Sequence, residues 1–453
     1  MSKLTQLYKT TKPRIPLFVA FLLGALSWYV LSYWRRLLGL PPIVRTRLEG
    51  RIDANLSRSE KAIQIASANL RAGIEKRYMP DGRQKRVLCA GMRNFREPWA
   101  RDFGFASFGL IELNEIQATR ETLEVFLQHQ TADGQFPVKI HATNMFERYI
   151  ISLLGRQQPI DLPIRPKYTT AHNTVSLDGN ALLIIAALLY LSKIDDVPFF
   201  QAHWQAFKNG LTWLEGHALG DDELLHQGAY TDWADSVSRV GRVLYTNVLY
   251  WKALHDFANV AKKYGSEEDV ADFSARASRV KEVINNEFWR EDLGYFVTSM
   301  EFELLNSDGN LLAVAWGLAT ARQSHAILDN LRRMAMADPV PTQVTDRIYG
   351  SKYIAIENRL GGIPHYHTLA AWLWLGGWHV VALTRMGRLS EARELLNRID
   401  QLIVRDGVVH EVFDSDGRPL KSFWYSSEAP LTWSAGVIVY AHSCYQRGLG
   451  GQD

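Results

Sequence analysis

The chain has 453 residues, 47% of them hydrophobic and 22% charged, and a formal net charge of +3. This composition is that of an ordinary globular protein and excludes a disordered, collagen-like or coiled-coil chain. The small net charge gives no indication of a nucleic-acid partner. Only two cysteines are present and they lack metal-ligand spacing, so we expect no disulfide framework and no metal site. No glycine motif for a nucleotide cofactor occurs, so we expect no cofactor.

The first predicted element is an apolar helix near the N-terminus. Residues 16–34 contain no charged side chain, and a run of about 19 residues is close to the minimum for a helix that crosses a bilayer. Basic residues flank the run on both sides, and aromatic residues crowd its end at 28–34, as in an interfacial belt. We therefore expect a single-pass membrane anchor, of unresolved orientation, within an N-terminal segment of residues 1–42. A cleaved signal peptide, a helix docked on the domain and a cytoplasmic location are the alternatives.

From about residue 55 onward the sequence alternates helical stretches with loops, and little of it is typical of strands. Apolar residues at three- and four-residue spacing indicate about twelve helices. Several neighbouring helices are joined by very short links, as in antiparallel helix hairpins. Leu182–Leu191 and Leu369–Leu383 are apolar nearly all round, which predicts an inner layer. The expected helices span residues 57–77, 100–114, 117–130, 176–193, 197–217, 244–264, 267–288, 308–320, 322–335, 366–386, 388–403 and 430–447.

Twelve helices arranged as six hairpins would close into a double-layered barrel. We therefore predict an all-α fold, an (α/α)6 barrel that forms one catalytic domain over residues 55–450 and follows the N-terminal hydrophobic helix. Two long stretches without helical pattern, near 131–175 and 336–365, interrupt the series. Long loops in a compact domain usually carry function, so we expect these two to contribute to the site.

Three loops bring acidic and aromatic residues together, and the first places Arg101 and Asp102 after Trp99, at the start of a predicted helix. An adjacent arginine and aspartate can hold neighbouring sugar hydroxyls, because one donates and the other accepts hydrogen bonds. A helix-capping aspartate next to a surface arginine is the alternative interpretation.

The second loop flanks Trp233 with Asp232 and Asp235. A carboxyl group beside an aromatic wall loses solvation in its charged form, so its pKa rises, which suits a general acid. A polar loop with a capping aspartate is the alternative.

The third loop carries Glu411 and Glu428 ahead of a predicted helix that contains Trp433. Glycoside hydrolysis needs a second carboxylate that stays ionised, either to activate water or to attack carbon. On residue chemistry alone both glutamates are candidates, and an acidic, solvated loop is the structural alternative.

Between about residues 90 and 445 these motifs occur in the order found in six-hairpin glycosidases. The stretch Trp99-Ala-Arg101-Asp102 resembles the Trp-x-Arg-Asp element of glucoamylases and of the neutral/alkaline invertases of glycoside hydrolase family 100. This resemblance implies that Arg101 and Asp102 bind the sugar in the −1 subsite. The stretch Trp233-Ala-Asp235 is similar to a segment of the invertases and of the amylo-α-1,6-glucosidases, which implies that Asp235 is the general acid.

The segment from Glu411 to Leu431-Thr-Trp433-Ser resembles one shared by glucoamylases and invertases, which implies that Glu411, not Glu428, is the general base. The pair Tyr366-His367 resembles a stretch of the invertases, and Ser176-Leu-Asp178 and Asp133 to Pro137 match loop positions that line such sites. Val237–Val243 is shorter than its counterpart, and Phe423-Trp424-Tyr425 has none. The substrate-binding set expected from the motifs is Trp99, Arg101, Asp102, Asp178, Asp232, Trp233, Tyr366, His367, Glu428 and Trp433.

The sequence therefore predicts an inverting glycosidase that acts on an α-glucoside-type or sucrose-type bond of an oligosaccharide or small glycoside. Asp235 would protonate the leaving oxygen while Glu411 activates water. An amylo-α-1,6-glucosidase-like debranching enzyme and a non-catalytic, membrane-tethered carbohydrate-binding protein are the alternatives. The presence of both acids favours catalysis, because a protein that only binds sugar needs no second ionised carboxylate.

Overall fold

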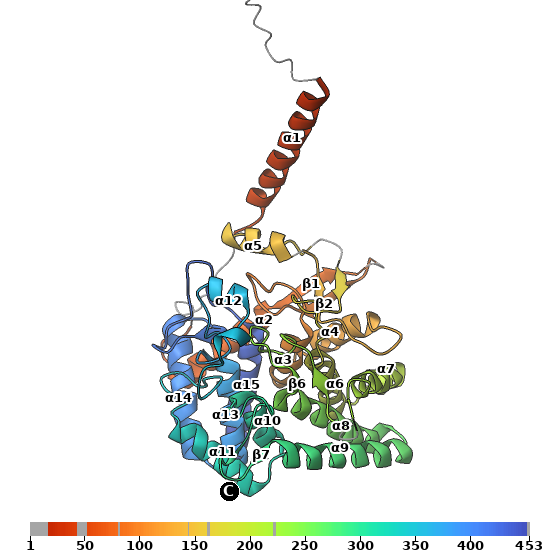
Figure 1. Cartoon of the computed structure of the whole chain (residues 1–453), viewed down its shortest axis with the longest axis vertical. Coiled ribbons are helices and arrows are strands. Elements are labelled where there is room, and N and C mark those ends of the chain that lie inside the picture. The colour runs from red at the N-terminus through yellow and green to blue at the C-terminus, as the bar shows by residue number, and fades with distance from the viewer. Residues whose placement is uncertain are drawn as a thin grey trace, which may run out of the picture.

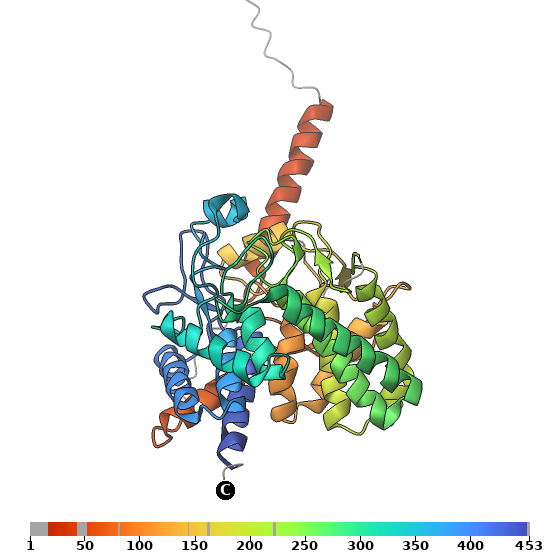
Figure 2. The ribbon, with the colours of Figure 1, turned by 60° about the horizontal axis from the view of Figure 1, so that its bottom comes forward.

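The twelve predicted helices are all present and form two concentric layers (Figures 1 and 2). The computed structural model describes residues 17–42, 52–79, 82–143, 145–160, 164–220 and 223–450. The inner layer consists of α3 (Ala100–Glu112), α6 (Asp178–Lys193), α8 (Leu244–Tyr264), α10 (Ser307–Trp316), α13 (Leu373–Arg385) and α15 (Thr432–Gly450). The outer layer consists of α2 (Arg58–Ala72), α4 (Ile116–Gln128), α7 (Val197–Glu215), α9 (Glu267–Phe288), α11 (Ala321–Arg333) and α14 (Leu389–Asp406).

The inner helices close into a ring, because each packs against the next and α15 returns to α3. Helices α6 and α13 carry apolar residues on every side and bury nearly all of them, as their sequences predicted. The outer helices are amphipathic; α14, for example, buries Leu395, Leu396 and Ile399 and exposes charged residues. The all-α barrel is therefore confirmed.

Two glycines allow the ring to close between α3 and α15. A Cβ on Gly109 would lie 2.3 Å from the carbonyl oxygen of Gly436, and a Cβ on Gly436 would lie 2.7 Å from the Cα of Ala106. Any larger side chain at either position would force the two helices apart.

Several short elements escaped the sequence analysis, because they are too short to show a periodic pattern. They occupy loops at the edges of the barrel, and one strand pair joins the residues after Glu411 to the start of α13. The short elements are α5 (Met145–Leu153), α12 (Ile356–Leu360) and the antiparallel pairs β1 (Ile74–Tyr78) with β2 (Gln84–Leu88), β3 (Lys139–His141) with β4 (Arg165–Lys167), β5 (His226–Gln227) with β6 (Gly241–Arg242), β7 (Trp289–Arg290) with β8 (Tyr295–Phe296), and β9 (Ala371–Trp372) with β10 (Val412–Phe413).

The predicted N-terminal helix is α1 (Leu17–Gly39), which extends away from the barrel on the side of α5 and α12 (Figures 1 and 2). Its end is fastened to the α5 region, where Arg36 pairs with Glu147 at 3.0 Å and the side chain of Arg156 donates to the carbonyl oxygen of Leu40 at 3.1 Å.

The transmembrane anchor predicted for residues 16–34 is wrong. Among the described residues, no helix combines the length and the apolar sequence that crossing a bilayer requires. The second half of α1 contains hydroxyl groups, at Ser27, Tyr29 and Ser32 among others, and charged residues follow at Arg35, so its apolar character weakens. Pro16, where the predicted run begins, lies outside the described residues.

Candidate active site

The predicted catalytic residues meet at the end of the barrel where the inner helices begin. A cavity of about 90 Å³ opens there, and two predicted carboxylates, Asp235 and Glu411, face it together with Arg101 and Asp102. Asp178, Asp232 and Glu428 do not line it. The lining residues are Phe95, Trp99, Arg101, Asp102, Trp233, Asp235, Tyr366, His367, Trp372, Glu411, Leu431 and Trp433.

Asp178 orients Arg101. Its carboxylate accepts from Nε of Arg101 at 2.6 Å and from Nη2 at 3.2 Å, and Nη2 also donates to the carbonyl oxygen of Thr231 at 3.3 Å. Asp178 is completely buried and lies in the first turn of α6, where the positive end of the helix dipole stabilises a negative charge. A bidentate pair of this kind fixes the plane of the guanidinium group. Asp178 therefore acts on the cavity through Arg101 and not by direct contact.

Asp102 follows Arg101 in the first turn of α3 and faces the same cavity. Burial raises the pKa of Asp102 to about 7; the positive charge of Arg101 lowers it, and the negative charges of Glu411 and Asp235 raise it further. Three carboxyl groups and one guanidinium group therefore share this cavity.

We expect Asp102→Asn to lower kcat/KM by about 30-fold, or about 2 kcal/mol, because the amide keeps the shape but replaces one carboxyl oxygen that can bind a sugar hydroxyl with an NH2 group. The matched control is Asp133→Asn in an exposed turn of a predicted site loop that does not line the cavity. Steady-state kinetics on a confirmed substrate would measure both variants. Equal kcat/KM for Asp102→Asn and wild type would contradict the assignment of this subsite.

Asp235 is the more open of the two predicted catalytic acids, with 48% of its side chain exposed. Nδ1 of His367 lies 4.0 Å from the Asp235 carboxylate, and burial lowers the pKa of that histidine well below its usual value. Desolvation by the surrounding protein raises the pKa of Asp235 to about 6; Arg101 opposes this shift, and Asp232 adds to it. Asp235 thus retains its proton to a higher pH than a solvated aspartate does.

Asp232 belongs to a buried ion cluster behind the cavity. Arg239 binds Asp232 at 2.7 Å through Nη2 and Asp308 at 3.0 Å through Nη1, and all three side chains are almost fully buried. The indole nitrogen of Trp233 donates to Asp308 at 2.5 Å, so the cluster also holds this cavity-lining ring. Arg239 escaped the sequence analysis; it lies in the segment that departs from the invertase pattern.

Glu411 is buried and accepts three hydrogen bonds. The hydroxyl of Tyr366 donates to Oε1, and Oε2 accepts from the hydroxyl of Tyr425 at 2.5 Å and from the backbone N–H of Glu428 at 3.0 Å. Burial raises the pKa of Glu411 above its usual value, and the three donors offset only part of this shift. The three donors fix the orientation of the carboxylate and favour its ionised form. Tyr425 also escaped the sequence analysis, although its segment had been noted as lacking a counterpart.

Glu428 has a different role from Glu411. It is fully buried, and its carboxylate accepts from the backbone N–H groups of Met92 at 3.0 Å, Arg93 at 2.6 Å and Asn94 at 2.9 Å. These contacts tie the loop before Phe95 to the loop that carries Glu411. The lone pairs of Glu428 are therefore committed to protein groups and not directed into the cavity.

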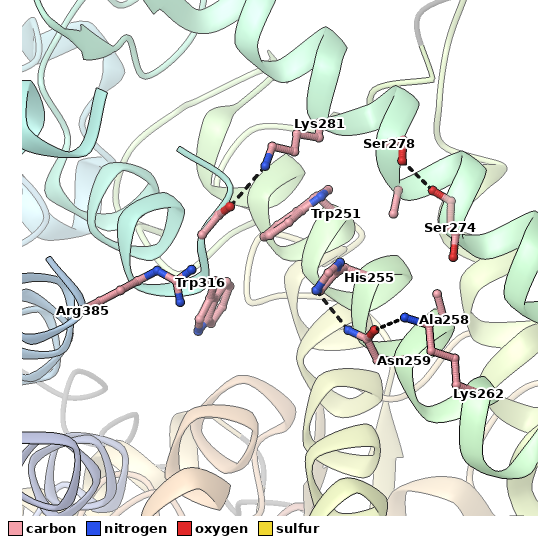
Figure 3. A pocket seen from close by; sticks show the side chains of 12 residues that line it. Trp251, His255, Ala258, Asn259, Lys262, Ser274, Ser278, Lys281, Trp316 and Arg385 are labelled. Atoms are coloured by element: carbon pink, nitrogen blue, oxygen red, sulfur yellow. Dashed lines mark hydrogen bonds between the residues drawn. The ribbon is translucent and has the colours of Figure 1, made fainter. Parts of the chain in front are cut away.

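A larger cavity, of about 440 Å³, lies toward the other ends of the inner helices, between α8 and α9. Figure 3 shows Trp251, Trp316, Lys281 and Arg385 around it. None of its lining residues is an aspartate or a glutamate. The two predicted catalytic carboxylates thus line the smaller cavity and not this one.

The comparisons with known proteins agree with this arrangement. Residues 127–338 match the model of the bacterial α-L-rhamnosidase six-hairpin glycosidase domain, a stretch that includes Asp235. No curated protein matches the chain. The comparisons do not show the closeness to invertases that the motifs predicted.

Several solved structures share the fold. A rhamnosidase from Klebsiella oxytoca with rhamnose bound superposes with a TM-score of 0.60 and 14% identity, over 89% of this chain and 66% of that enzyme. A wild-type glycosidase gives 0.60 and 13%, over 87% of this chain and 99% of that one. A family 78 rhamnosidase of Bacillus sp. GL1 gives 0.57 and 15%, over 86% of this chain and 35% of that enzyme.

These findings support catalysis over mere carbohydrate binding. The domain match, the closed helical ring and a cavity that contains two carboxylates point to the same kind of protein. The chain is a glycoside hydrolase with the six-hairpin glycosidase fold.

Proposed function

We propose that the chain hydrolyses a terminal glycosidic bond with inversion, Asp235 serving as general acid and Glu411 as general base. The observation that supports this most is the difference between two carboxyl groups at one cavity. Asp235 is half exposed and has a pKa raised to about 6, while Glu411 is buried and held by three hydrogen-bond donors. A pair of acids in unlike environments is what acid and base roles require.

The reaction divides as follows between the two residues. Glu411 accepts a proton from water as the water oxygen bonds to the anomeric carbon, and Asp235 gives its proton to the glycosidic oxygen as that bond breaks. Arg101 and Asp102 hold the sugar hydroxyls, and the aromatic rings of Trp99 and Trp433 face its carbon skeleton. We assign this chemistry to a single domain, residues 55–450.

Glu428 is the weaker candidate for the base. Both glutamates are buried and accept three hydrogen bonds, but the donors on Glu428 are backbone N–H groups of a neighbouring loop, and its carboxylate does not line the cavity. A base must present a free lone pair to water at the cavity, and Glu411 lines the cavity where Glu428 does not.

We propose an α-L-rhamnoside as the leading substrate class, because the matching domain model is that of α-L-rhamnosidases. The motif resemblance supports α-glucosides, sucrose and α-1,6-linked branches as the second set. A release assay on 4-nitrophenyl α-L-rhamnoside, 4-nitrophenyl α-glucoside, sucrose and isomaltose would rank them. Proton NMR at early times of hydrolysis should show that the released sugar has the anomeric configuration opposite to that of the substrate. A released sugar with the configuration of the substrate would contradict the mechanism.

We also expect kcat/KM to fall about tenfold per pH unit above about pH 6. The pKa of Asp235 is raised to about 6, and a general acid works only while protonated, so activity is present below this value and lost as the pH rises through it. Asp102, with a pKa of about 7, titrates nearby. A pH profile of wild type and Asp102→Asn separates the two groups: the alkaline limb should persist in the variant, and its disappearance would contradict the role of Asp235.

A further inference from the structure

Four exposed apolar side chains lie near the cavity, two on a turn and two on the short helix α12. Phe423 is 87% exposed and Trp424 65%, while Ile356 is 60% and Leu360 75% exposed. We call these four residues the apolar rim. Single exposed apolar residues are common on proteins, but a group of large ones usually marks a binding surface. The sequence also indicates that this surface is a feature of this chain, because Phe423-Trp424-Tyr425 has no counterpart in the enzymes whose motifs the chain resembles.

The two segments of the apolar rim are joined. Ser422 and Tyr425 close a turn through a backbone hydrogen bond of 2.8 Å, which places Phe423 and Trp424 at its tip with ring centroids 4.6 Å apart. The hydroxyl of Ser422 donates to the carbonyl oxygen of Gly361 at 2.6 Å, and Gly361 directly follows α12. On α12, Ile356 and Leu360 are four residues apart and so share one side of the helix.

Each segment is also anchored beside one of the two carboxyl groups of the proposed reaction. The turn continues into Tyr425, whose hydroxyl donates to Glu411 at 2.5 Å. The residue before α12, Ala355, donates its backbone N–H to the carbonyl oxygen of Ser236 at 2.9 Å, and Ser236 follows Asp235 in the chain. The apolar rim therefore adjoins the cavity, and Figure 1 shows α12 at the end of the barrel where the inner helices begin.

We infer that the apolar rim binds the leaving group of the substrate, so that the enzyme acts on amphiphilic glycosides, in which a sugar is joined to a hydrophobic alcohol. This inference rests on the proposed function. The general acid protonates the oxygen of the leaving group, which must therefore lie on the open side of Asp235. The start of α12 lies beside Asp235, since Ala355 is bonded to Ser236. A polar leaving group would gain nothing from four exposed apolar side chains, whereas an alkyl or aryl group would remove them from water.

The test compares methyl and n-octyl α-L-rhamnosides, the latter below its micelle concentration. Each buried methylene is worth about fourfold in binding, so wild type should prefer the octyl glycoside by about tenfold or more in kcat/KM. The double variant Phe423→Ser/Trp424→Ser should reduce this octyl-to-methyl ratio about tenfold. The control Val197→Ser/Leu449→Ser removes two exposed apolar side chains from segments outside the apolar rim, and should leave the ratio as in wild type. Circular dichroism melting would verify that both variants fold.

Calorimetric binding of the two glycosides to Glu411→Gln separates this inference from the proposed function. One outcome is that wild type cleaves neither glycoside while Glu411→Gln binds the octyl form about tenfold more tightly than the methyl form. If the rim variant then abolishes that difference in binding, the proposed sugar is wrong but the apolar rim does bind the leaving group. Equal kcat/KM values of wild type for the two glycosides, together with equal binding affinities, would overturn the inference. So would a rim variant that changes only the oligomeric state in light scattering, because the rim would then join copies of the chain.

Discussion

Glu411→Gln should lower kcat by about 10²–10⁴-fold and leave substrate binding close to that of wild type. Glutamine keeps the size of the side chain. Its amide oxygen can accept from Tyr425 and Glu428, and its amide NH2 group can donate to the hydroxyl of Tyr366, but it cannot accept a proton from water. The loss belongs to the chemical step, so it should appear in kcat and not in KM. Stopped assays on the best substrate of the release screen would measure both constants.

Glu428→Gln is the matched control, since it removes the other acid of the same loop. Its carboxylate holds three backbone N–H groups, so the variant should lose thermal stability and keep most of its kcat per folded molecule. The reverse outcome, an inactive Glu428→Gln and an active Glu411→Gln, would show that the base has been misassigned. If both variants remain fully active, two-carboxylate catalysis on this loop is wrong.

Arg239→Met should destabilise the fold by about 3–5 kcal/mol. The guanidinium group of Arg239 compensates the charges of both Asp232 and Asp308, and all three side chains are almost fully buried. Removing only the cation leaves two buried carboxylates without a counter-charge, which is the costly way to break a buried ion cluster. Urea unfolding followed by circular dichroism would report the shift in midpoint.

The control for this experiment is Arg322→Met, which breaks the pair between Arg322 and Glu291 on the surface. Both of these side chains are largely exposed, and water screens a pair of this kind, so Arg322→Met should keep the stability of wild type. Similar losses of stability for the two variants would mean that burial does not govern the strength of the Arg239 cluster. Loss of activity without loss of stability in Arg239→Met would instead place the residue in the reaction.

The helical layers could be predicted because each long helix repeats its apolar pattern over several turns. Leu182–Leu191 illustrates this, as its apolar residues on all sides left an inner position as the only stable one. The same method failed for α12 and for β9 with β10, because elements of two to five residues carry no period. Their positions depend on contacts with distant loops, which no local pattern records.

The residues of the candidate site also fall into two groups, those that the sequence predicted and those that only the structure revealed. Arg101, Asp235 and Glu411 lie in short motifs whose chemistry is visible in the residues themselves, and the structure brings them to one cavity. Arg239 and Tyr425 could not be found in this manner, since their importance comes from partners far away in the chain or across a turn. Both Glu411 and Glu428 are buried, but only Glu411 lines the cavity, and the position of a cavity is a property of the tertiary structure.

The closure of the ring between α3 and α15 determines when the enzyme can become active during synthesis. Gly109 and Gly436 meet across this seam, yet more than 300 residues separate them along the chain. Contacts over such distances in the sequence form slowly, because the intervening chain must first be ordered. Glu411 and Trp433 are also synthesised after five of the six inner helices. A nascent chain can therefore assemble most of its helical hairpins early, but it gains a closed barrel and a complete cavity only when α15 has been made.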